Sequence, residues 1–382
     1  MKQYALRKES STQWNYWYAV IPLILMVLTL KGYSQPSPKN TLPPLAVAGE
    51  GVLLSGELIY SLAAKPTAEC HASTIVEISD GLIAAWFGGS YERNPDVGIW
   101  ISFNLDGTWS KPTQVADGYQ NDSLRYPTWN PVLFKPANGP LMLFYKVGPN
   151  PREWWGMLMT SENEGRTWSM PRRLGRHSAI GDLLGPVKNK PIQLKDGTVL
   201  CPSSTEREVN NTDLWLVHFE ATKDFGKTWE VIGPIHDGKA FNAIQPSILT
   251  YADGRMQILC RTGERVIAQS WSVDKGKTWS LMTATQLPNP DSGIDAITLR
   301  DGRQLLVYNH TIRSGPFPSG RDMLNVAVST DGILWKTVMT LEQQEGEYSY
   351  PAVIQTTDGN VHITYTYDRR SVKHVVIDPR QM

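Results

Sequence analysis

Short apolar segments of strand-like composition alternate with tight-turn dipeptides over most of this chain. An apolar run precedes and another follows each dipeptide, as in STIVEIS and LIAAWF or SILTY and RMQILC. Asp-Gly and Asn-Gly suit the positive φ angles of hairpin turns. The dipeptides recur at steps of 58, 58, 57, 48 and 57 residues, at Asp80-Gly81, Asn138-Gly139, Asp196-Gly197, Asp253-Gly254, Asp301-Gly302 and Asp358-Gly359. This regularity predicts six copies of one hairpin-containing repeat.

A second repeat interleaves with the first and adds another hairpin to each unit. In its good copies an Asp or Asn can bond nearby backbone N–H groups, a glycine takes the strained position and a Trp can pack between units. Two hairpins give four strands, the content of one propeller blade. We therefore expect an all-β fold, a six-bladed β-propeller of four-stranded antiparallel blades over residues 50–382. The good copies are Ser161–Trp168, Thr222–Trp229 and Ser272–Trp279, and weaker ones are Ser102–Trp109 and Ser329–Trp335.

The N-terminal region reads as a targeting segment. Basic residues precede an apolar run from about Trp17 to Leu30, which is short for a membrane span. We predict a signal peptide over residues 1–34, with an uncleaved N-terminal anchor as the alternative. Residues 35–49 are rich in Pro and Ser at their start and read as a linker. The chain is expected to be exported to the periplasm or the extracellular space.

Composition narrows the classes of partner. The 37 basic and 37 acidic residues balance, which disfavours nucleic acid or an anionic membrane as the main partner. Three cysteines, Cys70, Cys201 and Cys260, lie in apolar strand-like runs and are expected to be buried thiols. No metal-ligand spacing or phosphate-binding loop is visible, so we expect no metal and no cofactor. The chain is expected to be a monomer.

Hairpin geometry predicts where a functional site lies. Both hairpin turns of a repeat fall on one face, so the first residue of strand one and the last of strand two lie on the opposite face, around the central channel. Polar residues occupy those positions, and such convergence predicts a ligand site. Strand one begins at His71, Asn130, Lys188 or Lys190, Gln245, Asp295 and Tyr348, and strand two ends at Lys146, Ser203, Arg261 and His310.

The interleaved repeat resembles the Asp-box of sialidases, and the chain resembles the sialidase superfamily over nearly all of the predicted propeller. The resemblance implies that Arg261 and Arg321 bind the substrate carboxylate, that Tyr348 is the nucleophile and that Asp96 is the acid/base. Two positions depart from the family. His71 replaces the first arginine, and Gln245 replaces the glutamate that pairs with the tyrosine, although Gln cannot accept a proton.

The remaining candidates complete the predicted site. Lys188 and Lys190 are expected to add positive charge at the channel mouth, which would then attract anions. Glu206 and Asp295 are candidates for the carboxylate that Gln245 lacks, Glu92 is the alternative to Asp96, and His310 is a further binding candidate. Trp154 and Trp155 are candidates for stacking on a sugar or for packing between blades.

Three functions stay open on the sequence alone. The first is an exo-acting glycosidase of sialidase type on terminal acidic sugars of glycans or polysaccharides. The second is a uronate polysaccharide lyase that uses His71 and Tyr348 as base and acid. The third is a non-catalytic carbohydrate-binding propeller. In all three an acidic glycan is the expected partner.

Overall fold

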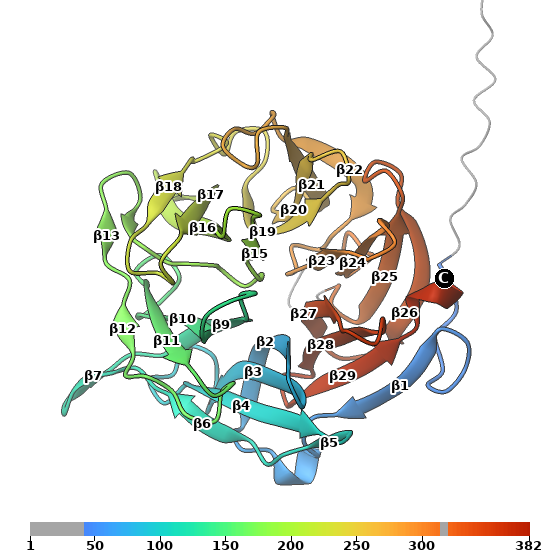
Figure 1. Cartoon of the computed structure of the whole chain (residues 1–382), viewed down its shortest axis with the longest axis horizontal. Coiled ribbons are helices and arrows are strands. Elements are labelled where there is room, and N and C mark those ends of the chain that lie inside the picture. The colour runs from blue at the N-terminus through green and yellow to red at the C-terminus, as the bar shows by residue number, and fades with distance from the viewer. Residues whose placement is uncertain (1–41, 314–319) are drawn as a thin grey trace, which may run out of the picture. The chain divides into compact units, whose positions relative to one another are not determined.

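The computed structural model describes residues 42–313 and 320–382 of the chain. In residues 42–382 six antiparallel sheets surround a central axis, so the fold is the expected six-bladed β-propeller (Figure 1). Five sheets have four strands, and the first has an additional fifth strand that pairs with its third. Each blade begins with its strand nearest the axis, which places the polar strand starts around the centre of the disc.

The strands follow the order that the repeats predict. Blade one contains β2 (Glu69–Ile78), β3 (Gly81–Gly89), β4 (Gly98–Leu105), β5 (Thr108–Trp109) and β6 (Thr113–Ala116). Blade two contains β9 (Thr128–Phe134), β10 (Leu141–Val147), β11 (Trp155–Ser161) and β12 (Arg172–Arg173). Blade three contains β15 (Ile192–Gln193), β16 (Val199–Val209), β17 (Thr212–Thr222) and β18 (Glu230–Ile232).

The second half of the disc repeats this arrangement. Blade four contains β19 (Ala243–Thr250), β20 (Met256–Thr262), β21 (Val266–Ser272) and β22 (Thr283–Pro288). Blade five contains β23 (Asp295–Thr298), β24 (Gln304–Tyr308), β25 (Met323–Ser329) and β26 (Lys336–Gln343). Blade six contains β27 (Tyr348–Gln355), β28 (Val361–Tyr367), β29 (Ser371–Ile377) and β1 (Leu53–Leu58). Smaller elements are the pairs β7 (Tyr119–Asn121) with β8 (Leu124–Arg125) and β13 (Arg176–His177) with β14 (Gly181–Asp182), and the 3-10 turns Leu62–Ala64 and Pro379–Gln381.

The outer strand of blade six comes from the other end of the chain. β1 pairs antiparallel with β29, from Leu53 opposite Ile377 to Leu58 opposite Lys373. Just before it, Leu45 forms a bridge to Thr340 of β26. Part of the segment expected to be a linker therefore lies along blade five. The predicted signal or anchor segment, and the linker up to residue 41, lie outside the described residues.

Both classes of turn lie where the repeats place them. Each Asp-Gly or Asn-Gly turn joins the first and second strands of a blade, and the Asp-boxes join the third and fourth. In the box of blade four, the Ser272 hydroxyl accepts the N–H of Gly276 at 2.9 Å, and Asp274 Oδ1 accepts the N–H of Thr278 at 2.9 Å. The box tryptophan, Trp279, stacks on Phe219 of blade three with ring centroids 4.7 Å apart. The boxes thus join neighbouring blades on the face away from the predicted site.

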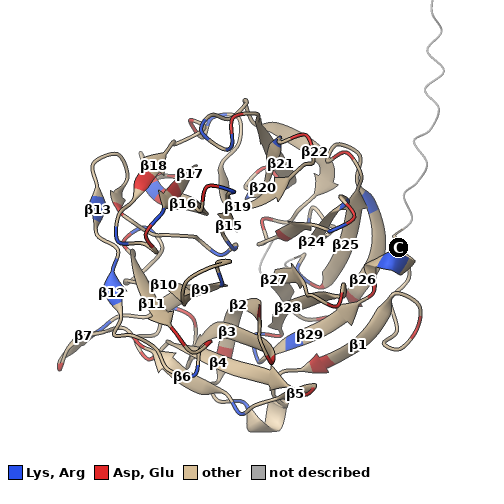
Figure 2. Ribbon diagram, viewed as in Figure 1, with Lys and Arg blue, Asp and Glu red and all other residues tan. Residues whose placement is uncertain are grey.

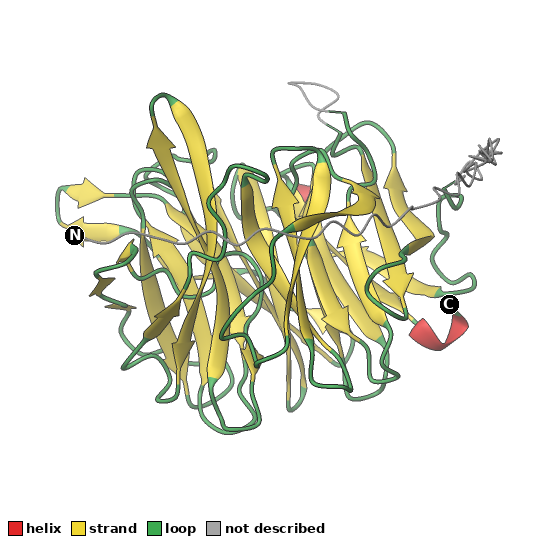
Figure 3. Ribbon diagram, turned by 90° about the horizontal axis from the view of Figure 1, so that it is seen from above, coloured by secondary structure: helices red, strands yellow, loops and turns green. Residues whose placement is uncertain are grey.

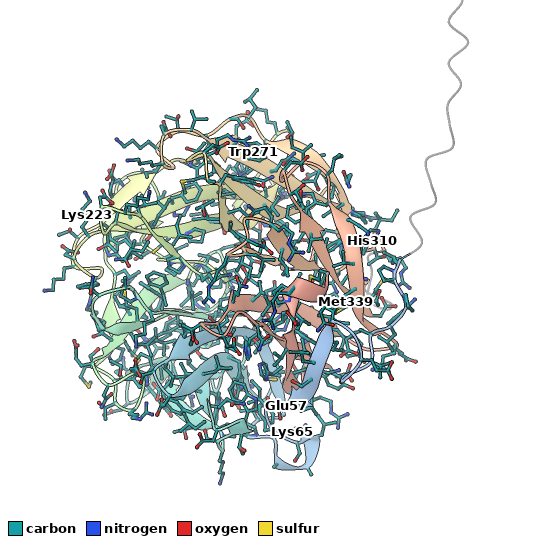
Figure 4. The ribbon with its side chains drawn as sticks, turned by 45° about the vertical axis from the view of Figure 1, so that its right-hand side comes forward. Glu57, Lys65, Lys223, Trp271, His310 and Met339 are labelled. Carbon is teal, nitrogen blue, oxygen red and sulfur yellow. The ribbon has the colours of Figure 1, made fainter. Side chains whose placement is uncertain are left out.

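Side chains fill the spaces between the blades, and Lys223 lies at the periphery of the disc (Figure 4). The three cysteines are free and buried, as the sequence predicts. Within residues 42–313 and 320–382, no helix is long and apolar enough to cross a bilayer.

Candidate functional site at the channel mouth

Four of the six innermost strands have a β-bulge near their first residues. Register shifts leave two residues unpaired at Ala72, Asn130, Gln245 and Tyr350, each together with the residue after it. The first residue of each unpaired couple has a positive φ, from 38° at Asn130 to 56° at Gln245. Bulges of this kind redirect a side chain, and non-glycine residues with positive φ concentrate at functional sites. The bulges therefore determine which side chains reach the channel mouth.

The bulge in blade six changes which tyrosine reaches the site. Tyr348 is 1% exposed, packs in the core of the blade and donates its hydroxyl to the Glu345 carbonyl at 3.1 Å. Tyr350, two residues later and with a φ of 54°, lines the mouth cavity. Tyr348 is thus wrong as the tyrosine at the mouth, because the bulge shifts the alternation of the strand. A signal was available: Asn130, Gln245 and Tyr350 all directly precede a proline.

Arg261, at the end of β20, is the central basic group of the mouth. Its side chain is 8% exposed. Nε and Nη2 donate to Asp291 Oδ1 at 2.9 and 2.6 Å, and Nη1 donates to the Tyr350 hydroxyl at 2.5 Å. Nη1 also lies 3.4 Å from Gln245 Oε1, and the guanidinium carbon is 5.5 Å from the centre of the Trp215 ring. Burial opposes the charge of Arg261, but Tyr350 and Asp291 outweigh it and raise the pKa of the guanidinium.

Two further arginines share one carboxylate. Arg321 donates from Nη1 to Glu347 Oε1 at 3.0 Å, and Arg369 donates from Nε to Glu347 Oε2 at 2.8 Å. The Arg321 guanidinium carbon also lies 5.5 Å from the centre of the Tyr350 ring. Burial opposes ionisation of Glu347, yet the surrounding positive groups hold the pKa of its carboxyl well below the usual range. Arg369 and Glu347 were not among the sequence candidates.

His71 and Gln245 both reach the mouth cavity, as their strand positions predict. His71 is 3% exposed, and its ring centre lies 4.2 Å from that of Tyr350. Burial, aided by the charge of Arg369, holds the pKa of His71 well below its ordinary value, so the imidazole is neutral near pH 7. Its Nδ1 is 2.9 Å from the Thr366 hydroxyl, which fixes the ring.

The sequence candidates for a catalytic carboxylate occupy different positions. Glu206 lines the mouth cavity, and its carboxylate accepts no hydrogen bond from the described residues. Burial raises the pKa of Glu206, with the charge of Arg261 opposing the change. Glu92 also lines the cavity and accepts Arg369 Nη1 at 2.6 Å. Asp96 is instead exposed, does not line the cavity and accepts the N–H of Ser90 at 3.0 Å, so it braces its loop.

Lys188 and Lys190 hold blades together and do not line the mouth cavity. Lys188 is 3% exposed and donates from Nζ to the carbonyls of Ile294 and Pro351, in blades five and six. Burial lowers the pKa of Lys188 to about 7. Lys190 donates to Asp295 Oδ2 at 2.8 Å. Their expected role as charges at the mouth is therefore replaced by a structural one.

Asp295 and His310 are likewise engaged elsewhere. Asp295 is 2% exposed and accepts the Ser247 hydroxyl at 3.1 Å and the N–H of Val353 at 2.8 Å, which links blades four, five and six. His310 contacts the hydroxyls of Tyr308 and Thr337 within blade five and does not line the cavity. Strand order alone placed both residues at the rim, but it does not give the direction of a side chain.

The mouth is close to electrically balanced. Acidic and basic residues of both signs lie around the centre of the disc (Figure 2). The site contains three arginines and four carboxylates. Asp291, Glu347 and Glu92 form ion pairs with the arginines, and Glu206 interacts with the charge of Arg261. The expected excess of positive charge is thus not found among the described residues. The mouth cavity has a volume of about 110 Å³, and aromatic walls come from Trp129, Trp154 and Trp215.

Trp154, one of two candidate sugar platforms, is also a packing residue. It is 6% exposed and meets Trp129 edge to face, with ring centroids 6.0 Å apart. Trp155 packs under the guanidinium of Arg173 at 4.5 Å, away from the cavity. Among the described residues, no group of three or more His, Cys, Asp or Glu side chains is arranged to hold a metal ion.

The six-bladed propeller with Asp-box turns places this chain in the class of sialidase-like folds. The sequence profile described as the BNR repeat-like domain matches residues 80–363. Because that match covers most of the chain, the protein belongs to the BNR repeat-like domain family. A search of curated proteins finds no matching sequence.

Solved structures share the fold at low sequence identity. A Hadza microbial sialidase is 18% identical with a TM-score of 0.69, over 86% of this chain and 69% of that one. The sialidase NanB from Streptococcus pneumoniae is 14% identical with a TM-score of 0.66, over 85% and 71%. A protein of unknown function from Dyadobacter fermentans is 14% identical with a TM-score of 0.68, over 85% and 98%. These likenesses establish the fold of the sialidases for this chain.

Proposed function

We propose that this protein is an exo-acting glycosidase of sialidase type, which releases a terminal acidic sugar from a glycan or polysaccharide. The observation that carries the proposal is the contact between Arg261 Nη1 and the Tyr350 hydroxyl at 2.5 Å inside the mouth cavity. A neutral phenol is a weak nucleophile. The guanidinium holds the phenolic oxygen in the cavity through a charge-assisted hydrogen bond and thereby positions it for attack.

Glu206, which also lines the mouth cavity, is the proposed acid/base of the reaction. Sialidases use a tyrosine nucleophile, and the same acid/base residue acts in both steps of a retaining reaction. Tyr350, as the phenolate formed by loss of its proton to water, attacks the anomeric carbon while Glu206 gives its proton to the leaving oxygen, so one C–O bond forms as the other breaks. Glu206 then takes a proton from water, which displaces Tyr350. The raised pKa of Glu206 keeps it protonated to higher pH for the first step.

An acidic sugar suits the cations of the mouth. Arg261 is the one Lys or Arg side chain among the described residues that line the cavity, and Arg321 lies beside it, because both guanidinium groups donate to the Asp291 carbonyl. Arginine recognises carboxylates through several N–H groups in one plane. Asp291 already occupies one edge of the Arg261 guanidinium, so a substrate carboxylate would share or displace that contact.

The direct test is a panel of aryl sialosides and uronides, with release of the aryl group as the readout. A fluorinated acidic glycosyl donor should label Tyr350, which peptide mass spectrometry detects. Tyr350→Phe should abolish both release and labelling. Failure of the wild-type protein to release any acidic sugar would overturn the proposal, and glycan binding without turnover would instead favour a binding propeller.

A second candidate function is eliminative cleavage of a uronate-containing polysaccharide. The observation that favours it is the neutral His71 ring 4.2 Å from Tyr350, together with an uncharged Gln245 beside Arg261. His71 would remove the proton next to the carboxylate, and Tyr350 would protonate the leaving oxygen as the C–O bond breaks and a C=C bond forms. The unsaturated product absorbs in the ultraviolet, so uronate polymers that yield no such absorbance exclude this route.

A further inference from the structure

Four large apolar side chains are exposed on the Asp-box face, which lies opposite the mouth. Figure 3 shows the disc edge-on, with turns along both of its faces. The exposed fractions of the four side chains lie between 55% and 89%. All four lie in or just after the box turns of two neighbouring blades, and together they are called the apolar patch: Val273 and Leu281 in blade four, Ile333 and Leu334 in blade five.

Trp271 of β21 joins the two halves of the apolar patch. In blade four its carbonyl accepts the N–H of Ser280 at 2.8 Å, so Leu281 lies beside the end of β21. In blade five Gly332 lies against the Trp271 ring, where a Cβ would approach Cη2 to 3.0 Å. Ile333 directly follows that glycine. The two box turns therefore touch, and their exposed apolar side chains form one surface.

Lysines flank the patch in the same turns. Lys275 and Lys277 belong to the box of blade four, and Lys336 directly follows the box of blade five. All three side chains are exposed, and none forms an ion pair with a described residue. A long lysine side chain can lie along an apolar surface while its ammonium group stays in a polar layer. The patch is thus bordered by positive groups that are available to a partner.

The acidic residues of the two boxes are bonded within their own turns. Asp274 Oδ1 accepts the N–H of Thr278 at 2.9 Å. Asp331 Oδ1 accepts the N–H of Leu334 at 2.9 Å. Because these carboxylates are already engaged by the backbone, the lysine ammonium groups are the charges of the two turns that remain for a partner.

The lysines of blade four also border a groove of about 570 Å³ beside the patch. Trp229 and Ile232 of blade three give this groove half-buried apolar walls. The exposed charges of its rim that form no ion pair with a described residue are those of Lys275, Lys277 and Glu230. The groove therefore offers space and a net positive charge to an anionic headgroup.

The composition of the patch favours a lipid surface over a protein partner. Protein interfaces are depleted in lysine and use aromatic residues, methionine and arginine instead. Here the exposed side chains are aliphatic residues and lysines, which suit acyl chains and phosphates respectively. The aromatic ring that joins the two turns, Trp271, is occupied by Arg255, whose guanidinium carbon lies 5.0 Å from the ring centre.

The described chain begins on the same part of the disc. The Pro43 carbonyl accepts the Thr340 hydroxyl at 2.7 Å, and Leu45 bridges to Thr340 of β26. Residues 1–41, with their apolar run from about Trp17 to Leu30, are therefore attached at blade five, which carries half of the patch. An apolar run of this composition and an apolar patch on the blade that holds it suit one and the same surface.

We propose that the Asp-box face of blades four and five docks on a lipid bilayer with anionic headgroups. The apolar patch inserts between the lipids, and the flanking lysines contact the phosphates. The 37 basic and 37 acidic residues of the chain disfavour binding to a membrane by net charge, so apolar insertion supplies most of the affinity. The channel mouth then opens away from the bilayer. This inference is independent of the reaction proposed for the mouth.

The first experiment measures insertion at single positions of the full chain. The three native cysteines are buried, so Leu281→Cys can be labelled selectively with an environment-sensitive fluorophore. Vesicles of equal parts phosphatidylethanolamine and phosphatidylglycerol should shift its emission to the blue. Ile312→Cys is the matched control, because Ile312 is exposed and follows β24 on the face of the mouth. A blue shift at both positions, or at neither, would overturn the proposal.

The second experiment measures vesicle affinity. Leu281→Asp/Leu334→Asp should lower it about tenfold or more and leave Tm unchanged, because both side chains are exposed. Lys275→Ala/Lys277→Ala should lower affinity for the anionic vesicles about fivefold per lysine, and should leave binding to phosphatidylcholine vesicles unchanged. Lys239→Ala is the control, since Lys239 is exposed in the loop before β19 on the face of the mouth. Equal affinities in the variants and the wild-type protein would reject the patch.

Sedimentation equilibrium without lipid tests a second copy of the chain as the occupant. The wild-type protein should remain a monomer at micromolar concentration. A dimer that Leu281→Asp/Leu334→Asp dissociates would assign the patch to self-association and overturn the lipid proposal. A monomer that inserts at position 281 into anionic vesicles supports it.

Discussion

Arg261 and Tyr350, from blades four and six, are joined by a hydrogen bond of 2.5 Å between Nη1 and the phenolic oxygen. The two residues are 89 positions apart in the chain, and the contact depends on the bulge that turns Tyr350 toward the axis. The Arg261 guanidinium also donates a hydrogen bond to the Asp291 carboxylate. The phenolic oxygen of Tyr350, the guanidinium of Arg261 and the carboxylate of Asp291 thus form one chain of contacts across the mouth.

We predict that the two tyrosines of β27 have different roles, Tyr350 in catalysis and Tyr348 in stability. Tyr350→Phe removes the proposed nucleophile and should lower kcat/KM by about 10²-fold or more while the protein stays folded. Tyr348→Phe removes a hydrogen bond to the Glu345 carbonyl and should cost about 1 kcal/mol of unfolding free energy with activity retained. Kinetics and thermal unfolding of both variants check this, and loss of activity in Tyr348→Phe alone would restore the sequence-based choice.

Arg261→Ala should reduce both activity and stability. Loss of a charge-assisted contact of about 1.5–3 kcal/mol lowers kcat/KM roughly tenfold to a hundredfold or more. The protein should also lose about 1–3 kcal/mol of stability, because Asp291 and Tyr350 lose their donor. The double variant Arg261→Ala/Asp291→Asn should recover stability and leave activity low. Independent, additive stability effects would show that the pair is not coupled.

The pH dependence of activity should report Glu206. Burial raises the pKa of its carboxyl, so the protonated form that donates to the leaving group persists to higher pH than for an exposed glutamate. The rate of the acid-assisted step should fall as pH rises through that pKa. In Glu206→Gln this alkaline limb of kcat/KM should disappear and the rate should drop by about 10²-fold or more. An unchanged profile in the variant would assign the acid to another group, with Glu92 the next carboxylate in the cavity.

The Asp-box face should affect stability without affecting catalysis. Ser272 is 2% exposed, and its hydroxyl accepts the N–H of Gly276. Ser272→Ala leaves that buried donor unpaired and should cost about 1–3 kcal/mol. Calorimetry should show a lower Tm, whereas kcat/KM stays at the wild-type value. A folded variant that had lost activity would contradict the assignment of the two faces.

The fold was predictable because its turns are local. Six Asp-Gly or Asn-Gly dipeptides and five box sequences need only their neighbouring residues to form, so their spacing gave blade number, strand order and the face of the site. Glu206, His71, Gln245 and Arg261 were placed at the mouth by the same reasoning, and the structure brings all four into one cavity.

The remaining site residues depend on information that is not local. A bulge moves the mouth position from Tyr348 to Tyr350, and only the recurrent proline after the bulged residue hints at it. Lys188 and Asp295 begin inner strands as expected, but their side chains bond to groups on other blades. Arg369 comes from the tight turn after β28, a connection that carries no repeated motif. These positions depend on the direction of each side chain and on its partners in other blades, neither of which the local sequence specifies.

The pairing of β1 with β29 sets an order on synthesis of the protein. Leu53 is among the first described residues to emerge from the ribosome, and its partner Ile377 is among the last. The ring therefore stays open, with β1 unpaired, until β29 near the end of the chain is available. Contacts so distant in sequence form slowly, and unpaired edges recruit other chains. Removal of residues 50–58 should leave five complete blades and a permanent edge, and such a protein should aggregate where the full chain remains soluble.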